Sequence, residues 1–105
     1  MTDTRSARAL RAVLREFDGR PILLARAIGD PIQRQHVEAW VRQGYVPPTQ
    51  CPRLEAVTRG RYTCEQLSAK GVNWARIPDA LWPWHPQGRP VVDVSRNLIA
   101  PAEAA

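Results

Sequence analysis

Two short segments with apolar residues at helical spacing, separated by a Gly-Asp-Pro sequence, constrain the fold of this chain most. The first segment covers residues 22–28, the second covers residues 33–41, and the Gly-Asp-Pro sequence occupies residues 29–31. Glycine permits a positive φ, and proline disfavours helical geometry in the residue before it, so a turn is expected there. We therefore predict two helices joined by this turn, one from Pro21 to about Ile28 and one that starts between Pro31 and Gln33 and ends at Gly44.

Three further helices are expected, two from the spacing of their apolar residues and one from a capping box. Apolar residues recur at intervals of three and four over residues 4–17 and again over residues 50–58. A capping box formed by Thr63 and Gln66 predicts the start of a short fifth helix. We expect an all-α fold in which residues 1–76 form one five-helix domain with a helix-turn-helix.

Residues 77–105 form a C-terminal extension of different composition. Three of the four tryptophans lie between residues 74 and 90, among several prolines and without a helical period. We expect this extension to be irregular, with one short strand over Val91–Val94.

The net charge of +5 is concentrated in the half of the chain that holds the helix pair. Residues 1–62 carry 11 arginines against six acidic residues, whereas the basic and acidic residues of positions 63–105 are equal in number. A positive field beside a helix-turn-helix is what a binder of a polyanion requires. The sequence contains no apolar segment near the roughly 20 residues needed to cross a bilayer, so we expect a cytoplasmic protein without membrane contact.

Cysteine and histidine spacing argues against a metal site. The two cysteines, Cys51 and Cys64, are far from His36 and His85 in sequence, and no Cys-x-x-Cys pair is present. No glycine-rich phosphate loop or local catalytic grouping occurs either. We expect no metal, no cofactor and no enzymatic activity.

The predicted third helix has an inward and an outward face. The inward face contains Val37, Trp40 and Val41, whereas the outward residue types are those that pair with base edges in the major groove. His36 is interpreted as a neutral, partly buried side chain. We predict base contacts from Arg34, Gln35, Glu38 and Ala39, phosphate contacts from Gln33, Arg42, Arg20, Arg26 and Arg53, and a motif scaffold of Ala25, Gly29, Val37 and Trp40.

These residues also have a simpler interpretation. Arg34 and Glu38 are four residues apart, so they could form an exposed ion pair worth a few tenths of a kcal/mol. The arginines of residues 5–15 could equally be a solvated helix face.

A more selective pattern is formed by residues 24–29 and 34–40, then by Gly44-Tyr45-Val46-Pro47, and by Cys51-Pro52-Arg53-Leu54-Glu55 with Thr58. These residues give the chain a resemblance to the Cro/YdaS-type DNA-binding proteins of phages and bacteria over roughly residues 8–74. It implies a lambda-repressor-like fold and a transcriptional regulator of a prophage or of a toxin–antitoxin-like operon. It also implies a dimer that binds a palindromic operator in double-stranded DNA.

The tryptophans of the extension leave two alternatives open. They either pack on the helical domain or are buried against a second subunit or another protein partner. The candidate dimer or partner contacts are Trp74, Trp82, Trp84, Val92 and Val94, and the strand could pair with its symmetry mate. A competing hypothesis is therefore that the chain is a protein-interaction module, which binds a toxin or a polymerase subunit through this extension. Binding of single-stranded nucleic acid is a weaker option, since the extension has no net positive charge.

Overall fold

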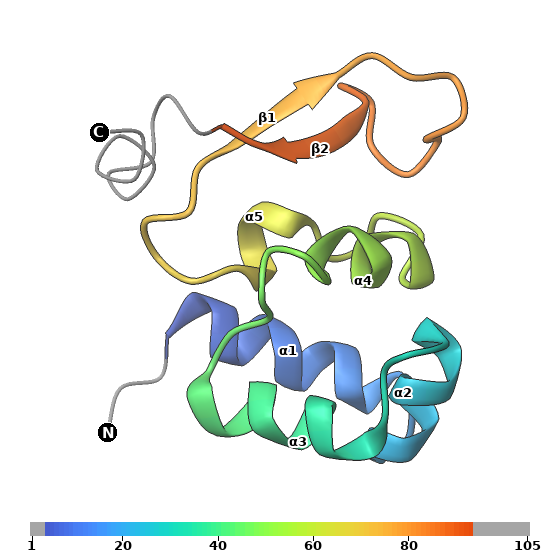
Figure 1. The fold of residues 1–105 in the computed structure, drawn as a ribbon, viewed down its shortest axis with the longest axis vertical. Helices are drawn as coiled ribbons and strands as arrows, with labels where there is room; N and C mark the ends of the chain where they lie inside the picture. Colours follow the sequence, from blue (N-terminus) through green and yellow to red (C-terminus); the bar gives the residue numbers. More distant parts are fainter. Residues whose placement is uncertain (1–3, 94–105) are drawn as a thin grey trace.

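The computed structural model describes residues 4–93, which form five helices and a small antiparallel sheet (Figure 1). The number and order of the helices agree with the prediction, and their ends differ from it by a few residues at most. The helices are α1 (Arg5–Arg15), α2 (Pro21–Ile28), α3 (Arg34–Gln43), α4 (Cys51–Val57) and α5 (Cys64–Leu67), and the strands are β1 (Trp74–Ile77) and β2 (Arg89–Val92).

Local signals in the sequence explain where the helices begin. The side chain of Thr4 accepts a hydrogen bond of 3.1 Å from the backbone N–H of Ala7 at the start of α1. Pro21 occupies the first turn of α2, where its missing N–H leaves no intrahelical bond unmade. The predicted capping box is confirmed at α5, where the backbone N–H of Thr63 donates to Gln66 Oε1 over 2.9 Å.

The core lies where α1, α2 and α3 meet α4 and α5. Leu10, Leu24, Val37, Leu54 and Leu67 are almost completely buried, and they come from all five helices. Full burial of one such side chain stabilises the fold by about 1.5–3 kcal/mol. The helices therefore form a single cluster from which α3 cannot separate without exposing the core.

One residue of the predicted inward face of α3 lies outside this core. Val41 is 39% exposed, whereas Val37 is fully buried and Trp40 is 4% exposed. The placement of Val41 in the core was therefore wrong. The physical reason is that the buried stripe of α3 is narrow: it includes Val37 and Trp40, and the position after Trp40 turns toward solvent.

A β-hairpin spans the border between the helical domain and the extension, so the one strand expected in the extension has a partner just before it. β1 pairs with β2 in antiparallel register, with Trp74 opposite Val92 and Ile77 opposite Arg89. The strand predicted at 91–94 thus lies at 89–92, and its partner is within the same chain. β1 was missed because it is short and lacks the alternation of apolar and polar residues. It also spans residue 76, where the sequence places the end of the helical domain.

No helix among the described residues is long and apolar enough to span a membrane.

Candidate nucleic-acid interface

The turn between α2 and α3 is held by backbone hydrogen bonds and by one arginine. Gly29 ends α2 with a φ of +92°, and its N–H donates to the carbonyl of Ala25 over 3.0 Å. The N–H of Ile32 then donates to the carbonyl of Gly29, and Arg53 of α4 donates from Nη1 to the carbonyl of Asp30 over 2.9 Å. The turn is therefore fixed to α4 as well as to the helices that it joins.

Close packing of α2 on α3 depends on small and apolar side chains. Ala25 is 2% exposed, and Ile32, just before α3, is 8% exposed. Val37 and Trp40 anchor the inner side of α3 in the same cluster. The four scaffold residues predicted from the sequence thus lie where α2, the turn and α3 meet.

The outer side of α3 carries the predicted base-contacting residues. Arg34 and Gln35 are exposed, and Glu38 and Ala39 are half-buried on the following turn. Arg34 Nε lies 3.7 Å from Glu38 Oε2, and these two side chains are 62% and 42% exposed. An ion pair with this exposure contributes only about 0.3–0.5 kcal/mol, so it holds neither side chain firmly.

The first turn of α3 contains a cap that the sequence interpretation did not identify. His36 Nδ1 accepts a hydrogen bond of 2.9 Å from the backbone N–H of Gln33, and the side chain of Gln33 caps the helix in return. Gln35 Nε2 also donates to Gln33 Oε1 over 2.7 Å. His36 is exposed rather than partly buried, so its interpretation was wrong. The three-residue spacing of a capping box was the available signal, although Gln and His are unusual residue types for it.

The predicted phosphate contacts fall into two groups. Arg20 precedes α2, Arg26 lies in its last turn and Arg42 lies in the last turn of α3, and all three are exposed. Gln33 and Arg53 are exposed too, but their polar groups already bond within the protein, at the cap of α3 and at the turn. The guanidinium groups of Arg20, Arg26 and Arg42 are therefore more available for contact with a phosphate than the side chains of Gln33 and Arg53.

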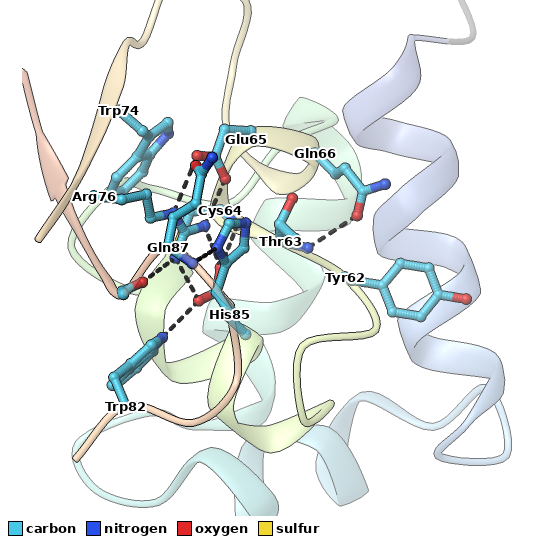
Figure 2. A network of polar contacts seen from close by, with 12 residues as sticks. Tyr62, Thr63, Cys64, Glu65, Gln66, Trp74, Arg76, Trp82, His85 and Gln87 are labelled. Carbon is cyan, nitrogen blue, oxygen red and sulfur yellow. Dashed lines mark hydrogen bonds and ion pairs between the residues drawn. The ribbon is translucent and has the colours of Figure 1, made fainter. Parts of the chain in front are cut away.

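A second group of polar side chains joins the hairpin to the helices (Figure 2). Arg76 of β1 donates to the fully buried carboxylate of Glu55 through both terminal nitrogens, over 2.8 and 2.7 Å, and to Glu65. Trp82 Nε1 donates to Glu55 Oε2 over 2.8 Å, and the backbone N–H of Cys64 donates to Glu55 Oε1 over 3.0 Å. Glu55 thus accepts hydrogen bonds from α5, from β1 and from the loop after β1.

The pKa values in this group follow from burial and from these bonds. Burial alone would raise the pKa of Glu55, but the hydrogen bonds from Arg76, Trp82 and Cys64 outweigh it and lower the pKa below its usual value. Burial raises the pKa of Cys51 to about 12, with a smaller contribution from Glu55, and it raises that of Cys64 as well. The carboxylate is therefore ionised and fully bonded, and the thiols are protonated. This is the chemistry of a structural cluster.

Two of the three tryptophans predicted as dimer or partner contacts form hydrogen bonds within their own chain. Trp74 Nε1 donates to Ser68 Oγ over 2.9 Å, and Trp82 donates to Glu55 as described. Trp84 is half-buried, and its carbonyl approaches Gly60 closely. Val92 is 37% exposed on β2, and Val94 lies outside the described residues. Among the described residues, no three His, Cys, Asp or Glu side chains are grouped as a metal ion requires.

The fold and the outer face of α3 define a small helical protein. Its helices α2 and α3 meet at a glycine turn, and α3 presents polar residues to solvent. The family described as bacterial toxin YdaS matches residues 15–76, which is more than half of the chain. The chain therefore belongs to this family. The matched residues begin at the end of α1 and include α2 to α5 and most of β1. No curated protein and no solved structure matches the chain.

Proposed function

We propose that this chain is a sequence-specific regulator of transcription that binds double-stranded DNA by placing α3 in the major groove. The observation that carries the proposal is the outer face of α3, where Arg34, Gln35, Glu38 and Ala39 are accessible on a helix fixed by α2, the turn and the core. In this proposal the five helices are of the lambda-repressor-like type and the protein acts as a Cro-like repressor. It requires neither a cofactor nor catalysis.

The residue types on this face suit the chemistry of the groove. An arginine pairs bidentately with guanine, a glutamine pairs with adenine, a glutamate accepts from cytosine, and an alanine methyl contacts thymine. A good bidentate pair contributes about 1–3 kcal/mol of discrimination, several times the value of the exposed Arg34–Glu38 pair. Both side chains can therefore leave each other for bases at little cost.

Binding to DNA also needs contacts that fix the protein on the phosphate backbone. Arg20, Arg26 and Arg42 stand at the ends of α2 and α3, where exposed guanidinium groups can reach phosphates beside the groove. Two copies would place two α3 helices in successive major grooves about 34 Å apart, which a palindromic operator requires. Membership of the YdaS toxin family supports a setting in a toxin–antitoxin-like operon or a prophage in a bacterial cytoplasm.

Selection of bound duplexes from random DNA tests the proposal. A preferred palindrome should emerge, and Arg34→Ala should weaken binding to it by about 1–3 kcal/mol, or roughly 5- to 150-fold, with little effect on unrelated duplexes. The matched control is Arg89→Ala, which removes an equal charge from β2, where Arg89 pairs with Asp79. If no sequence is enriched, or if both variants lose affinity equally on all duplexes, α3 does not read DNA.

A protein-interaction module is the second candidate, because the extension exposes apolar side chains, and Leu81 is the most exposed of those described. Leu81 is 88% exposed in the loop between β1 and β2, whereas Trp74 and Trp82 are engaged with their own domain. In this case Leu81→Ser would abolish capture of a protein partner, such as a purified cognate toxin, and leave the affinity for the selected duplex unchanged. A loss of duplex binding in this variant would argue against the module.

A further inference from the structure

The two edges of the hairpin differ in what they offer to another strand. The N–H of Asp93 donates to the carbonyl of Asn73 over 2.9 Å, which makes these residues a hydrogen-bonded pair of the antiparallel ladder. Hydrogen-bonded and non-hydrogen-bonded pairs alternate, so Ala75 with Val91 is the next hydrogen-bonded pair. The backbone groups of the residues between them, which are Trp74, Arg76, Pro90 and Val92, therefore point away from the ladder.

The outer edge of β2 is poorly suited to accept a strand. Pro90 is one of its two outward-pointing residues, and it has no N–H to donate. Pro90 is also buried. Prolines on an edge are a common way to prevent strand addition.

The outer edge of β1 has none of these obstacles. Trp74 and Arg76 each direct an N–H and a C=O outward, and no hydrogen bond from another described residue takes up these groups. Their side chains face the helices, where they bond to Ser68, Glu55 and Glu65, so they do not cover the edge.

We propose that β1 pairs with β1 of a second copy of this chain to form a continuous four-stranded antiparallel sheet. A twofold axis at Ala75 would place Trp74 of each copy opposite Arg76 of the other. These two pairs would make four backbone hydrogen bonds, and Ala75 would face Ala75 of the second copy in a non-hydrogen-bonded pair. Such pairs bring the Cα atoms to about 4.5 Å, and the small alanine side chain permits this approach.

The second copy fits this edge better than an unrelated strand does. Pairing with a second copy makes each two-stranded hairpin, which Arg76 and Trp82 anchor to the helices, one half of a four-stranded sheet. Ile77, which is 40% exposed, would lie opposite Asn73 of the second copy and lose part of its contact with water.

The inference rests on the proposed function in one respect: the role of the dimer would be to hold two α3 helices on one operator. The contact itself needs no DNA, so its failure is distinguishable from failure of DNA binding. This interface also replaces the expectation that the strand at 91–94 pairs with its symmetry mate, because that arrangement would use the edge that Pro90 blocks.

Cysteine cross-linking of the full chain tests the proposal directly. Ala75→Cys should yield a disulfide-linked dimer under mild oxidation, because facing residues of a non-hydrogen-bonded pair have the Cα spacing of a disulfide. The matched variant is Val91→Cys, which occupies the corresponding central position of the β2 edge and should remain monomeric on a non-reducing gel. Cys51 and Cys64 are buried, so the wild-type chain is the background control.

A second measurement distinguishes a stable dimer from chance encounters that cross-linking could trap. Sedimentation equilibrium should show that Ala75→Lys raises the Kd of the dimer roughly tenfold or more, because two ammonium groups would oppose each other on the axis. Val91→Lys should leave the Kd unchanged, and circular dichroism should show that both variants keep the fold. Cross-linking of Val91→Cys in preference to Ala75→Cys, or an unchanged Kd in Ala75→Lys, would overturn the proposal.

Discussion

Arg76 and Glu55 form a two-pronged ion pair across 21 residues of sequence, with Nη1 2.8 Å from Oε2 and Nη2 2.7 Å from Oε1. Their side chains are 5% and 0% exposed. Each charged group depends on its partner for burial, because a buried charge without a partner is strongly destabilising. The pair therefore ties the presence of the hairpin to the integrity of α4.

Removal of one partner should be costly. We expect Glu55→Gln to lower the free energy of unfolding by roughly 3 kcal/mol, the lower end for breaking a buried ion pair, because Arg76 loses its buried partner and keeps only the more exposed Glu65. Urea unfolding of the purified protein measures this. The control is Arg61→Met, which breaks the solvent-exposed pair of Arg61 with Glu16 and should lower stability far less than Glu55→Gln does. Equal losses in the two variants would show that burial of the Glu55 pair has no energetic consequence.

The same carboxylate should make stability depend on pH. The pKa of Glu55 is lower in the folded protein than its ordinary value of 4.5, so the folded state binds fewer protons than the unfolded state in this range. Its contribution is fully present above pH 4.5 and is lost as the pH falls through the folded pKa. Glu65, whose pKa is also lowered by Arg76 despite the opposing effect of burial, acts in the same direction.

Urea unfolding at a series of pH values between 7 and 3 checks this dependence. The difference in stability between the wild type and Glu55→Gln should be largest at neutral pH and should shrink at the acid end, where the wild-type carboxylate becomes protonated. A difference that stays constant across the series would mean that the ionised form of Glu55 receives no net stabilisation.

The sequence predicted the helices well because their signals are local. Pro21, Gly29 and the Thr63–Gln66 box each act within one helical turn, so their effects are read from neighbouring residues. The hairpin and the Glu55–Arg76 pair were missed for the opposite reason. Nothing near Glu55 distinguishes it from an ordinary exposed helix residue, and only the folded chain brings β1 over α4 and α5.

The candidate site divides in the same way. The outward positions of Arg34 and Gln35 follow from helical period alone, and the structure places them on the exposed face. The engagement of Arg53 with Asp30 depends on how α4 packs beside the turn, which no local pattern encodes. The exposure of Val41 is another tertiary effect, since its residue type is compatible with either side of the helix.

Two glycines with similar backbone angles should differ in their tolerance of a side chain. Gly60 has a φ of +79°, and a Cβ there would collide with the backbone carbonyl of Trp84. Gly19 has a φ of +69°, but a Cβ there would meet nothing within 4 Å. We expect Gly19→Ala to cost about 1–2 kcal/mol from the left-handed conformation alone. Gly60→Ala should cost clearly more, because the loop that carries Trp82 must move away from α4.

Chemical denaturation of both variants, followed by tryptophan fluorescence, measures this difference. The loop shift in Gly60→Ala should also alter the fluorescence of the native state, while that of Gly19→Ala should match the wild type. Similar costs in the two variants would mean that the loop after β1 accommodates the methyl group freely.

The salt dependence of DNA binding separates arginines that meet phosphate from those that serve the fold. Each phosphate contact releases condensed counterions, so log K falls with log salt concentration by about 0.9 for each contact. Arg42 is exposed in the last turn of α3, and we expect Arg42→Met to reduce the magnitude of this slope by about 1 on the selected operator and on unrelated duplexes alike. The guanidinium of Arg61 is held by Glu16 in two hydrogen bonds, so Arg61→Met should remove a positive charge and leave the slope unchanged.

Fluorescence anisotropy titrations from 50 to 200 mM salt, a range over which the affinity changes strongly, measure the slopes of both variants. If Arg61→Met lowers the slope as much as Arg42→Met does, binding follows net charge, and the position of Arg42 beside the reading face of α3 contributes nothing of its own.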